Sequence, residues 1–373
     1  QSCQKEKKNP HQKKQHQGTI YVSVRRDRME KRILLVPLSL FLIQLIIKSS
    51  HCKHILSSAP VSIHQQFATS SNCYFMNSIC SQHQRDISLT RMPTQHRQTD
   101  FKQEGYEIGE KLDSGGFGTV YKAQRDGRLV AVKVIKVSHP PGLDEDLQRE
   151  LMILTNIRHE HVVQTYDIMR TKNKIYIFME FASGGTIGKF VRTHGPLTET
   201  VSKLWFPPIV DALLYLKSQK IAHRDLKLDN VLLDDYMNPK LTDFGLSRYV
   251  LFDEKGRVRL TDSWVGTESY MPPEMLLKKK YNPFISDIWS LGVCLYVMMC
   301  NVYPFDRKNR PQMISNQLSR NWRWVDKVAK TVSPNLKDIE GRMLEPDVNK
   351  RISLEGISKH KWMPSSQFGI DHH

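Results

Sequence analysis

The chain has 373 residues, of which 39% are hydrophobic and 25% are charged, close to the usage of ordinary globular proteins. This composition excludes a chain that is disordered throughout, because enough apolar surface is present to build a large core. The net charge of +17 suggests a nucleic-acid or membrane partner, but residues 1–100 hold 15 Lys and Arg against 5 Asp and Glu. More than half of the excess therefore lies in the first quarter of the chain, so the charge alone predicts neither partner.

We expect residues 1–105 to form a disordered basic extension, because most of this stretch is polar and has no amphipathic period. It contains one apolar run, Ile33–Ile47, which is short for a membrane-spanning helix of about 20 residues and fits a signal-peptide core better. Three interpretations stay open. The residues up to 91 are not part of the native protein, or they form a genuine disordered arm, or they are a targeting segment.

From Tyr106 the pattern changes to that of a folded domain. Residues 106–112 alternate like a strand, and residues 114–121 (SGGFGTVY) predict a glycine turn that leads into a second strand. Glycine allows a backbone to approach a phosphate closely and to offer its N–H groups. A dinucleotide fingerprint would need a helix directly after the turn, so the β-rich continuation argues against one. Glycine-rich hairpins are common, and the turn alone does not establish a nucleotide site.

The next apolar strand, residues 129–135, is interrupted by one charged residue, Lys133. A lysine in such a strand is costly unless it is paired with an opposite charge. Glu150 lies in the amphipathic helix predicted over residues 147–154. We expect a Lys133–Glu150 ion pair that holds the lysine on nucleotide phosphates; the alternative is two solvated surface charges.

A dense group of motifs comes next: residues 221–230 (IAHRDLKLDN), 240–245 (KLTDFG), 272–274 (PPE) and 287–292 (DIWSLG). Together with the glycine turn, the strand lysine and the helix glutamate, they occur in the order and spacing of the eukaryotic protein kinases, which the chain resembles over residues 106–362. The resemblance implies an α+β, bilobal protein-kinase fold. Its parts would be a small β-rich N-lobe with one main helix (106–181), a larger, mostly helical C-lobe (182–362) and a short tail (363–373).

The resemblance also implies a serine/threonine protein kinase, which transfers the γ-phosphoryl group of ATP to protein hydroxyls with the help of Mg²⁺. Asp225 would be the catalytic base, and Lys227 would neutralise charge on the transferred phosphate. Asn230 and Asp243 would hold the metal ions. The other residues implied in catalysis are Lys133, Glu150 and Thr267, of which Thr267 would bond both Asp225 and Lys227.

The nucleotide-binding residues implied by the resemblance come from the glycine turn, from the strands around it and from the segment that links the lobes. They are Leu112, Gly115, Gly116, Gly118, Val120, Ala131, Lys133, Met179, Glu180, Ala182 and Leu232. Asp113 departs from the family pattern, because it stands where the first glycine of the turn is usual. We expect its carboxylate to weaken ATP binding.

The activation loop would span residues 243–274. Arg224, beside Asp225, would pair with a phosphate on Ser263, with Thr261 as the alternative site; a third possibility is a loop that orders without phosphorylation. Glu274 is expected to pair with Arg351 as a structural anchor. Within the serine/threonine class, the chain is similar to the calmodulin-dependent-kinase group and its testis-specific branch.

We expect a cytoplasmic monomer that acts on protein substrates and is activated by an upstream kinase or by autophosphorylation, with no nucleic-acid or membrane partner. Cys294 and Cys300, in an apolar helical stretch, are expected to be free thiols. One rival is a pseudokinase scaffold, motivated by Asp113 and by Pro207-Pro208, where we expect a helix to break and restart. Another is a secreted or membrane-anchored kinase, which rests on the apolar run alone.

Overall fold

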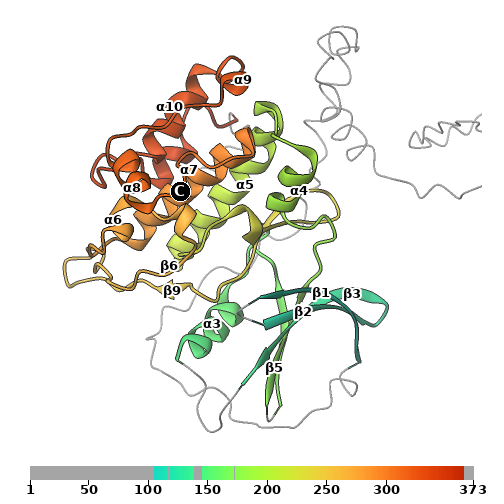
Figure 1. Cartoon of the computed structure of the whole chain (residues 1–373). Helices are drawn as coiled ribbons and strands as arrows, with labels where there is room; N and C mark the ends of the chain where they lie inside the picture. The colour runs from blue at the N-terminus through green and yellow to red at the C-terminus, as the bar shows by residue number, and fades with distance from the viewer. Residues whose placement is uncertain (1–104, 116–117, 138–144, 172, 365–373) are drawn as a thin grey trace, which may run out of the picture. The chain divides into compact units, whose positions relative to one another are not determined.

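The computed structural model describes residues 105–364, except for residues 116–117, 138–144 and 172 (Figure 1). The interpretations of the N-terminal extension, including its apolar run, lie outside the described residues, as does nearly all of the predicted tail. The described part of the chain contains the strand lysine, the helix glutamate, the HRD and DFG loops and the PPE segment.

The N-lobe is an antiparallel sheet with one helix beside it (Figure 1). Its strands run in the spatial order β1-β2-β3-β5-β4, and every neighbouring pair is antiparallel. The predicted strands and helix are confirmed, and Gly115 of β1 pairs with Gly118 of β2 on either side of the predicted glycine turn, whose residues 116–117 lie outside the described residues. The elements are β1 (Tyr106–Gly115), β2 (Gly118–Arg125), β3 (Arg128–Lys136), α3 (Glu145–Asn156), β4 (Thr165–Arg170) and β5 (Lys174–Glu180).

Strand β5 buries alternate side chains on opposite faces of the sheet. Ile175 and Ile177 join the large hydrophobic core that also contains the buried face of α3. Tyr176 and Phe178 belong to a small separate cluster, in which the ring of Tyr106 stacks on Phe178 with 3.8 Å between centroids. The two faces together fix the register of β3, whose residues 130–136 pair with the whole of β5.

The C-lobe is mostly helical, and its central helix is α7 (Pro283–Cys300), which packs against α4, α5 and α10. The side chain of Asn282 caps α7 by accepting a hydrogen bond from the Phe284 N–H, and Pro283 occupies the first turn, where its missing N–H costs nothing. The other helices are α4 (Ile187–His194), α5 (Glu199–Ser218), α6 (Pro273–Leu276), α8 (Arg310–Leu318), α9 (Asp326–Ala329), α10 (Pro334–Met343) and α11 (Leu354–Ser358).

Short strands position the loops that carry the motifs. Strand β6 (Ile221–Ala222) pairs with β9 (Arg248–Tyr249), and β7 (Val231–Leu233) pairs with β8 (Pro239–Leu241). The HRD loop, which follows β6, and the DFG loop, which precedes β9, are thereby held side by side. Two 3₁₀ turns, η1 (Leu228–Asn230) and η2 (Glu268–Tyr270), complete the lobe. The predicted α+β, bilobal architecture is confirmed.

Among the described helices, α7 is the one that is long and apolar enough to cross a membrane. It is also 89% buried inside the domain, as the core helix of a folded lobe is. Its two cysteines, Cys294 and Cys300, are buried free thiols, as predicted.

The predicted break at Pro207-Pro208 is wrong, because α5 runs through both residues without interruption. Each proline removes one backbone hydrogen bond, and an interior proline costs about 3 kcal/mol or more. The buried side chains of Trp205, Phe206 and Ile209 stand on both sides of the pair and pack into the main core. A broken helix would turn part of this apolar surface out of the core, at about 1.5–3 kcal/mol for each large side chain.

Glu340 on α10 is a fully buried carboxyl group whose two oxygens have no hydrogen-bond partner among the described residues. Burial raises the pKa of Glu340 well above its ordinary value, because the charged form loses its hydration. Burial therefore favours the protonated form of this side chain, because an unpaired charge at this depth would destabilise the fold.

We predict that Glu340→Met stabilises the protein by about 1–3 kcal/mol, since it removes an unpaired buried polar group at nearly constant volume. The raised pKa of Glu340 means that the native state binds a proton that the unfolded state releases, so stability falls as the pH rises above the ordinary carboxyl pKa of about 4.3. The gain from Glu340→Met should therefore be larger at about pH 8 than at about pH 5.5 in urea unfolding. Glu340→Gln is the control, because it removes the titration but keeps a polar group. An equal pH dependence in wild type and Glu340→Met would contradict the prediction.

Candidate active site

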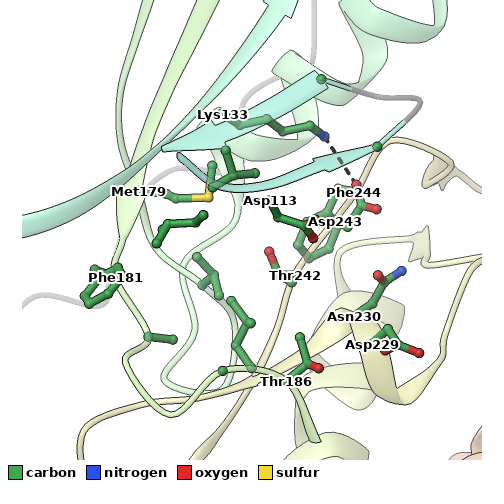
Figure 2. Close-up of a pocket in the computed structure, with 18 of the residues that line it drawn as sticks. Asp113, Lys133, Met179, Phe181, Thr186, Asp229, Asn230, Thr242, Asp243 and Phe244 are labelled. Atoms are coloured by element: carbon green, nitrogen blue, oxygen red, sulfur yellow. Dashed lines mark hydrogen bonds and ion pairs between the residues drawn. The ribbon is translucent and has the colours of Figure 1, made fainter. Parts of the chain in front are cut away.

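A cavity of about 600 Å³ lies where the N-lobe sheet meets the first loops of the C-lobe (Figure 2). Most of the predicted nucleotide-binding residues line it: Leu112, Gly115, Gly118, Val120, Lys133, Met179, Ala182 and Leu232. Gly116 lies outside the described residues. Two further predicted residues are not part of the lining. Ala131 is buried opposite Met179 in the sheet, and the Glu180 carboxylate lies 2.7 Å from the ammonium of Lys240.

Lys133 reaches the cavity from β3, and its ammonium contacts two carboxylates. Its Nζ lies 2.7 Å from Oε1 of Glu150 on α3 and 3.2 Å from Oδ1 of Asp243. Figure 2 shows the contact with Asp243 as a dashed line. Burial by itself would lower the pKa of Lys133, but the charges of Glu150 and Asp243 more than offset it and raise the pKa. The predicted Lys133–Glu150 ion pair is confirmed, and the lysine is held as a cation.

Asp225 is held by four hydrogen bonds from three neighbours. Its Oδ1 accepts from the backbone N–H and the hydroxyl of Thr267, at 2.8 and 2.7 Å. Its Oδ2 accepts from Lys227 Nζ at 2.6 Å and from Asn230 Nδ2 at 3.2 Å. Lys227 also donates to the Thr267 hydroxyl at 3.0 Å, so the expected Thr267 contacts are confirmed.

The loop that carries Asp225 depends on a buried residue whose role was not predicted from the sequence. Asp287 on α7 accepts hydrogen bonds from the backbone N–H groups of His223 and Arg224, at 2.8 and 2.9 Å. Arg224 has a φ of +68°, a strained conformation for a non-glycine residue that these bonds help to maintain. The signal in the sequence is an aspartate inside an apolar helix, because a charge there must be satisfied by some partner.

Asp243 and Asn230 both face the cavity (Figure 2). Asp243 has a φ of +64°, and the next residue, Phe244, is buried against the ring of His223. Asn230 donates from its amide nitrogen to the backbone oxygen of Asp225 at 2.9 Å, which leaves the amide oxygen free to act as a ligand. A carboxylate and an amide oxygen on one cavity wall fit Mg²⁺, which prefers hard oxygen donors.

The part of the cavity wall that α4 provides was not predicted. Thr186 caps α4 by accepting a hydrogen bond from the Lys189 N–H at 3.0 Å, and both residues line the cavity. Arg192, one turn further on, lies 2.7 Å from the Asp229 carboxylate. A threonine directly before an amphipathic segment is the signal that could have placed this helix start.

Ser263 is bonded to Arg224 without any modification. Nη2 of Arg224 donates to the backbone oxygen and to the hydroxyl of Ser263, both at 2.8 Å. Thr261, the alternative phosphosite, instead forms a β-bridge with Tyr281, with two backbone hydrogen bonds of 2.9 Å. The two candidate sites therefore have different environments, and Ser263 is the one next to the arginine.

The predicted Glu274–Arg351 pair is confirmed as a two-pronged, buried contact. Nη1 and Nη2 of Arg351 lie 2.7 and 3.0 Å from the two carboxylate oxygens of Glu274. Arg351 also donates to the backbone oxygens of Ile285 and Glu345. The pair ties the end of the activation loop to α7 and to the loop after α10.

The cavity thus contains a lysine held by carboxylates of both lobes and two oxygen-bearing side chains, Asn230 and Asp243, and Asp225 is fixed beside it through Asn230. This arrangement fits a phosphotransferase site. The protein kinase domain family matches residues 106–363, and the chain belongs to that family.

Among known proteins, the chain is similar to the testis-specific serine/threonine-protein kinase 1 of Mus musculus, at 37% identity over 72% of the chain and 74% of the relative. It is also similar to the human protein of that name, at 37% identity over 70% of the chain and 72% of the relative. Arabidopsis thaliana CBL-interacting serine/threonine-protein kinase 13 is 38% identical over 69% of the chain and 51% of that protein. The predicted serine/threonine kinase and its resemblance to the testis-specific kinases are confirmed.

Proposed function

We propose that the chain transfers the γ-phosphoryl group of ATP to serine or threonine hydroxyls of protein substrates, with Asp225 as the catalytic base and Mg²⁺ as cofactor. The observation that carries the proposal is the simultaneous contact of Lys133 with Glu150 and Asp243. This contact joins the nucleotide-facing strand to a metal-binding carboxylate. Positioning and charge stabilisation are the main requirements of phosphoryl transfer, and this contact supplies both.

The N-lobe side of the cavity suits a nucleotide. Gly118 has a φ of +132°, and a side chain there would meet the backbone oxygen of Val134 at 2.7 Å, so the turn can follow this course only with glycine. Val120, Met179 and Leu232 provide apolar walls for the base. Lys133 would hold the phosphates.

On the opposite wall, Asn230 and Asp243 would hold Mg²⁺, which when bound would neutralise charge on the phosphate oxygens. Asp225 would accept the proton of the substrate hydroxyl and aim that hydroxyl in line with the phosphate. Each carboxylate oxygen of Asp225 already accepts two hydrogen bonds, so the hydroxyl has to displace one of them. The bond from Asn230, at 3.2 Å, is the longest of the four and the one most easily given up.

A pseudokinase scaffold is disfavoured, because Lys133, Asn230 and Asp243 line one cavity and Asp225 is hydrogen-bonded to Asn230 beside it. Outside residues 1–100 the net charge is a modest +7, and several of those cations lie in the site, which supports a protein substrate over a nucleic acid. We place the activity on a monomer in the cytoplasm, where ATP is available.

The test is transfer of labelled phosphate from Mg·ATP to a generic acceptor such as casein. Wild type should be active, while Asp225→Asn and Asp243→Asn should each lose about a thousandfold or more in rate, since each removes an essential charge. Glu254→Gln, at an exposed loop position, is the control and should keep full activity. An inactive wild type would favour the scaffold instead, and equal activity in all four proteins would show that the transfer does not depend on Asp225 and Asp243.

For regulation, we propose that phosphorylation of Ser263, by an upstream kinase or by the chain itself, strengthens the existing contact with Arg224. Arg248 lies near two other arginines, Arg224 and Arg149. Burial lowers the pKa of Arg248, and the positive charges of Arg224 and Arg149 lower it further. Arg149 is already paired with Glu145 and Asp146. An added phosphate, which carries about two negative charges, would offset the repulsion between Arg224 and Arg248.

Ser263→Ala is expected to lower kinase activity about tenfold or more, because neither the hydroxyl contact nor the phosphate can form. Thr261→Ala should leave activity nearly unchanged, since it keeps both backbone bonds to Tyr281 and loses only the long, 3.3 Å bond from the Ser263 N–H to the Thr261 hydroxyl. Initial rates of phosphate transfer, measured before and after phosphatase treatment of the wild type, check both. Equal rates in wild type and both variants would show that the loop orders without phosphorylation.

Asp113 departs from the family pattern, and a substitution there tests whether its carboxylate weakens ATP binding. Its side chain lines the cavity (Figure 2), and Oδ1 accepts a hydrogen bond from the Ser114 N–H at 2.7 Å. Asp113→Asn keeps the shape but removes a charge that repels phosphate, so the KM for ATP should fall about two- to fivefold, and less at high salt. Asp126→Asn, in the exposed turn between β2 and β3, is the matched control and should leave the KM unchanged. An unchanged KM in Asp113→Asn would show that the carboxylate does not act on the nucleotide.

A further inference from the structure

A second cavity of about 600 Å³ lies in the C-lobe and shares no lining residue with the active site. Four segments far apart in the sequence build it: the activation loop, the stretch from α6 to the start of α7, the end of α8 and the loop after α10. We call this cavity the C-lobe groove. Its lining includes Leu260, Leu277, Tyr281, Leu318 and Val348.

The groove is lined by apolar side chains that are exposed to solvent. Leu260, Leu277, Leu318 and Val348 are between 40% and 57% exposed, and they come from four different segments. Large exposed apolar residues are normal when they are scattered singly, but a cluster of them in a hollow marks an interaction surface.

The rim of the groove is positively charged. Lys279 and Lys280 line the groove and Lys278 directly precedes them in the chain. All three are exposed, and none of them makes an ion pair with a residue in the described part of the chain. The two acids in the wall already have partners, because Glu274 is paired with Arg351 and Asp347 lies 3.4 Å from Lys350 Nζ. The lysines are therefore the charges left for an incoming molecule.

We propose that the C-lobe groove binds a segment of a partner protein that carries at least two apolar anchor residues flanked by acidic residues. The apolar residues would fill the hollow, and the acids would meet the three lysines. The chain's own N-terminal hundred residues are a poorer occupant, since they have 15 Lys and Arg against 5 Asp and Glu and would be repelled by the rim. A second copy related by a twofold axis would bring a second lysine cluster against the first.

An occupant of the groove would contact residues that hold the activation loop. Leu260 belongs to that loop, and Tyr281 is bridged to Thr261 and donates from its hydroxyl to the backbone oxygen of Ser263 at 2.9 Å. The proposal concerns binding and does not depend on the catalytic roles proposed above, so its test can fail or succeed separately.

The test is fluorescence anisotropy of the full chain with labelled peptides of about twelve residues, each carrying about four Glu and two Leu at spacings of about two to seven residues. At least one peptide should bind with a Kd of about 100 μM or tighter, as is usual for short docking segments. Matched peptides with Leu→Ala or with Glu→Lys should bind about tenfold more weakly or worse.

The variants locate the binding. Leu318→Ala with Val348→Ala should weaken binding about tenfold or more, while Leu204→Ala, an equally exposed leucine on α5, should not change it. Charge reversal of Lys278, Lys279 and Lys280 to Glu should weaken the Glu peptides about tenfold and favour the Lys peptides. The same reversal at the exposed Lys327, Lys330 and Lys359 is the control.

The proposal is overturned if no peptide of the panel binds below about 1 mM, or if binding is the same in the groove variants and the controls. It is also overturned if sedimentation shows a dimer of the full chain that is lost in the Leu318→Ala, Val348→Ala variant, because the occupant is then a second copy. Tighter binding of a peptide with the sequence of residues 33–47 would instead assign the groove to the chain's own extension.

Discussion

The active site depends on the buried ammonium of Lys133, which is shared between Glu150 and Asp243. Three elements meet at this group: β3 supplies the lysine, α3 supplies Glu150, and the loop after β8 supplies Asp243. Removing one partner of a buried pair leaves the other charge uncompensated and costs about 3–5 kcal/mol. The position of α3 and the course of the DFG loop are therefore tied to one another through a single nitrogen atom.

The C-lobe depends on a different kind of contact, in which a buried carboxylate accepts hydrogen bonds from backbone N–H groups and not from a side chain. Asp287 fixes the N–H groups of His223 and Arg224, and the loop then presents Asp225 to Lys227 and Thr267. The carboxylate on α7 thus sets the position of Asp225 without touching it. Arg351 plays a comparable part at the other end of the activation loop, where it holds Glu274 and two backbone oxygens together.

Contacts could be predicted from the sequence where a charged residue needs a partner and the order of the motifs indicates which residue that partner is. A lysine in an apolar strand, such as Lys133, predicts an ion pair of this kind. Asp225 was predicted from the motif of the loop that carries it. The prediction was wrong where burial outweighs a local backbone preference. The prolines at 207 and 208 predict a break in the helix, but burial of the neighbouring side chains keeps α5 continuous. Glu340 and the C-lobe groove were not foreseen, since burial without a partner and a hollow built by four segments exist only after folding.

The contact between Arg224 and the unmodified hydroxyl of Ser263 has a consequence for how the enzyme would be controlled. A loop that is already seated has a resting position, so a phosphate would not have to carry it there from a distant conformation. The interaction of the phosphate with Arg224 would then stabilise a loop conformation that is already populated before modification. Such an arrangement would give graded control of kinase activity. The unmodified enzyme would keep a low activity, and the total activity would rise with the fraction of chains that are phosphorylated.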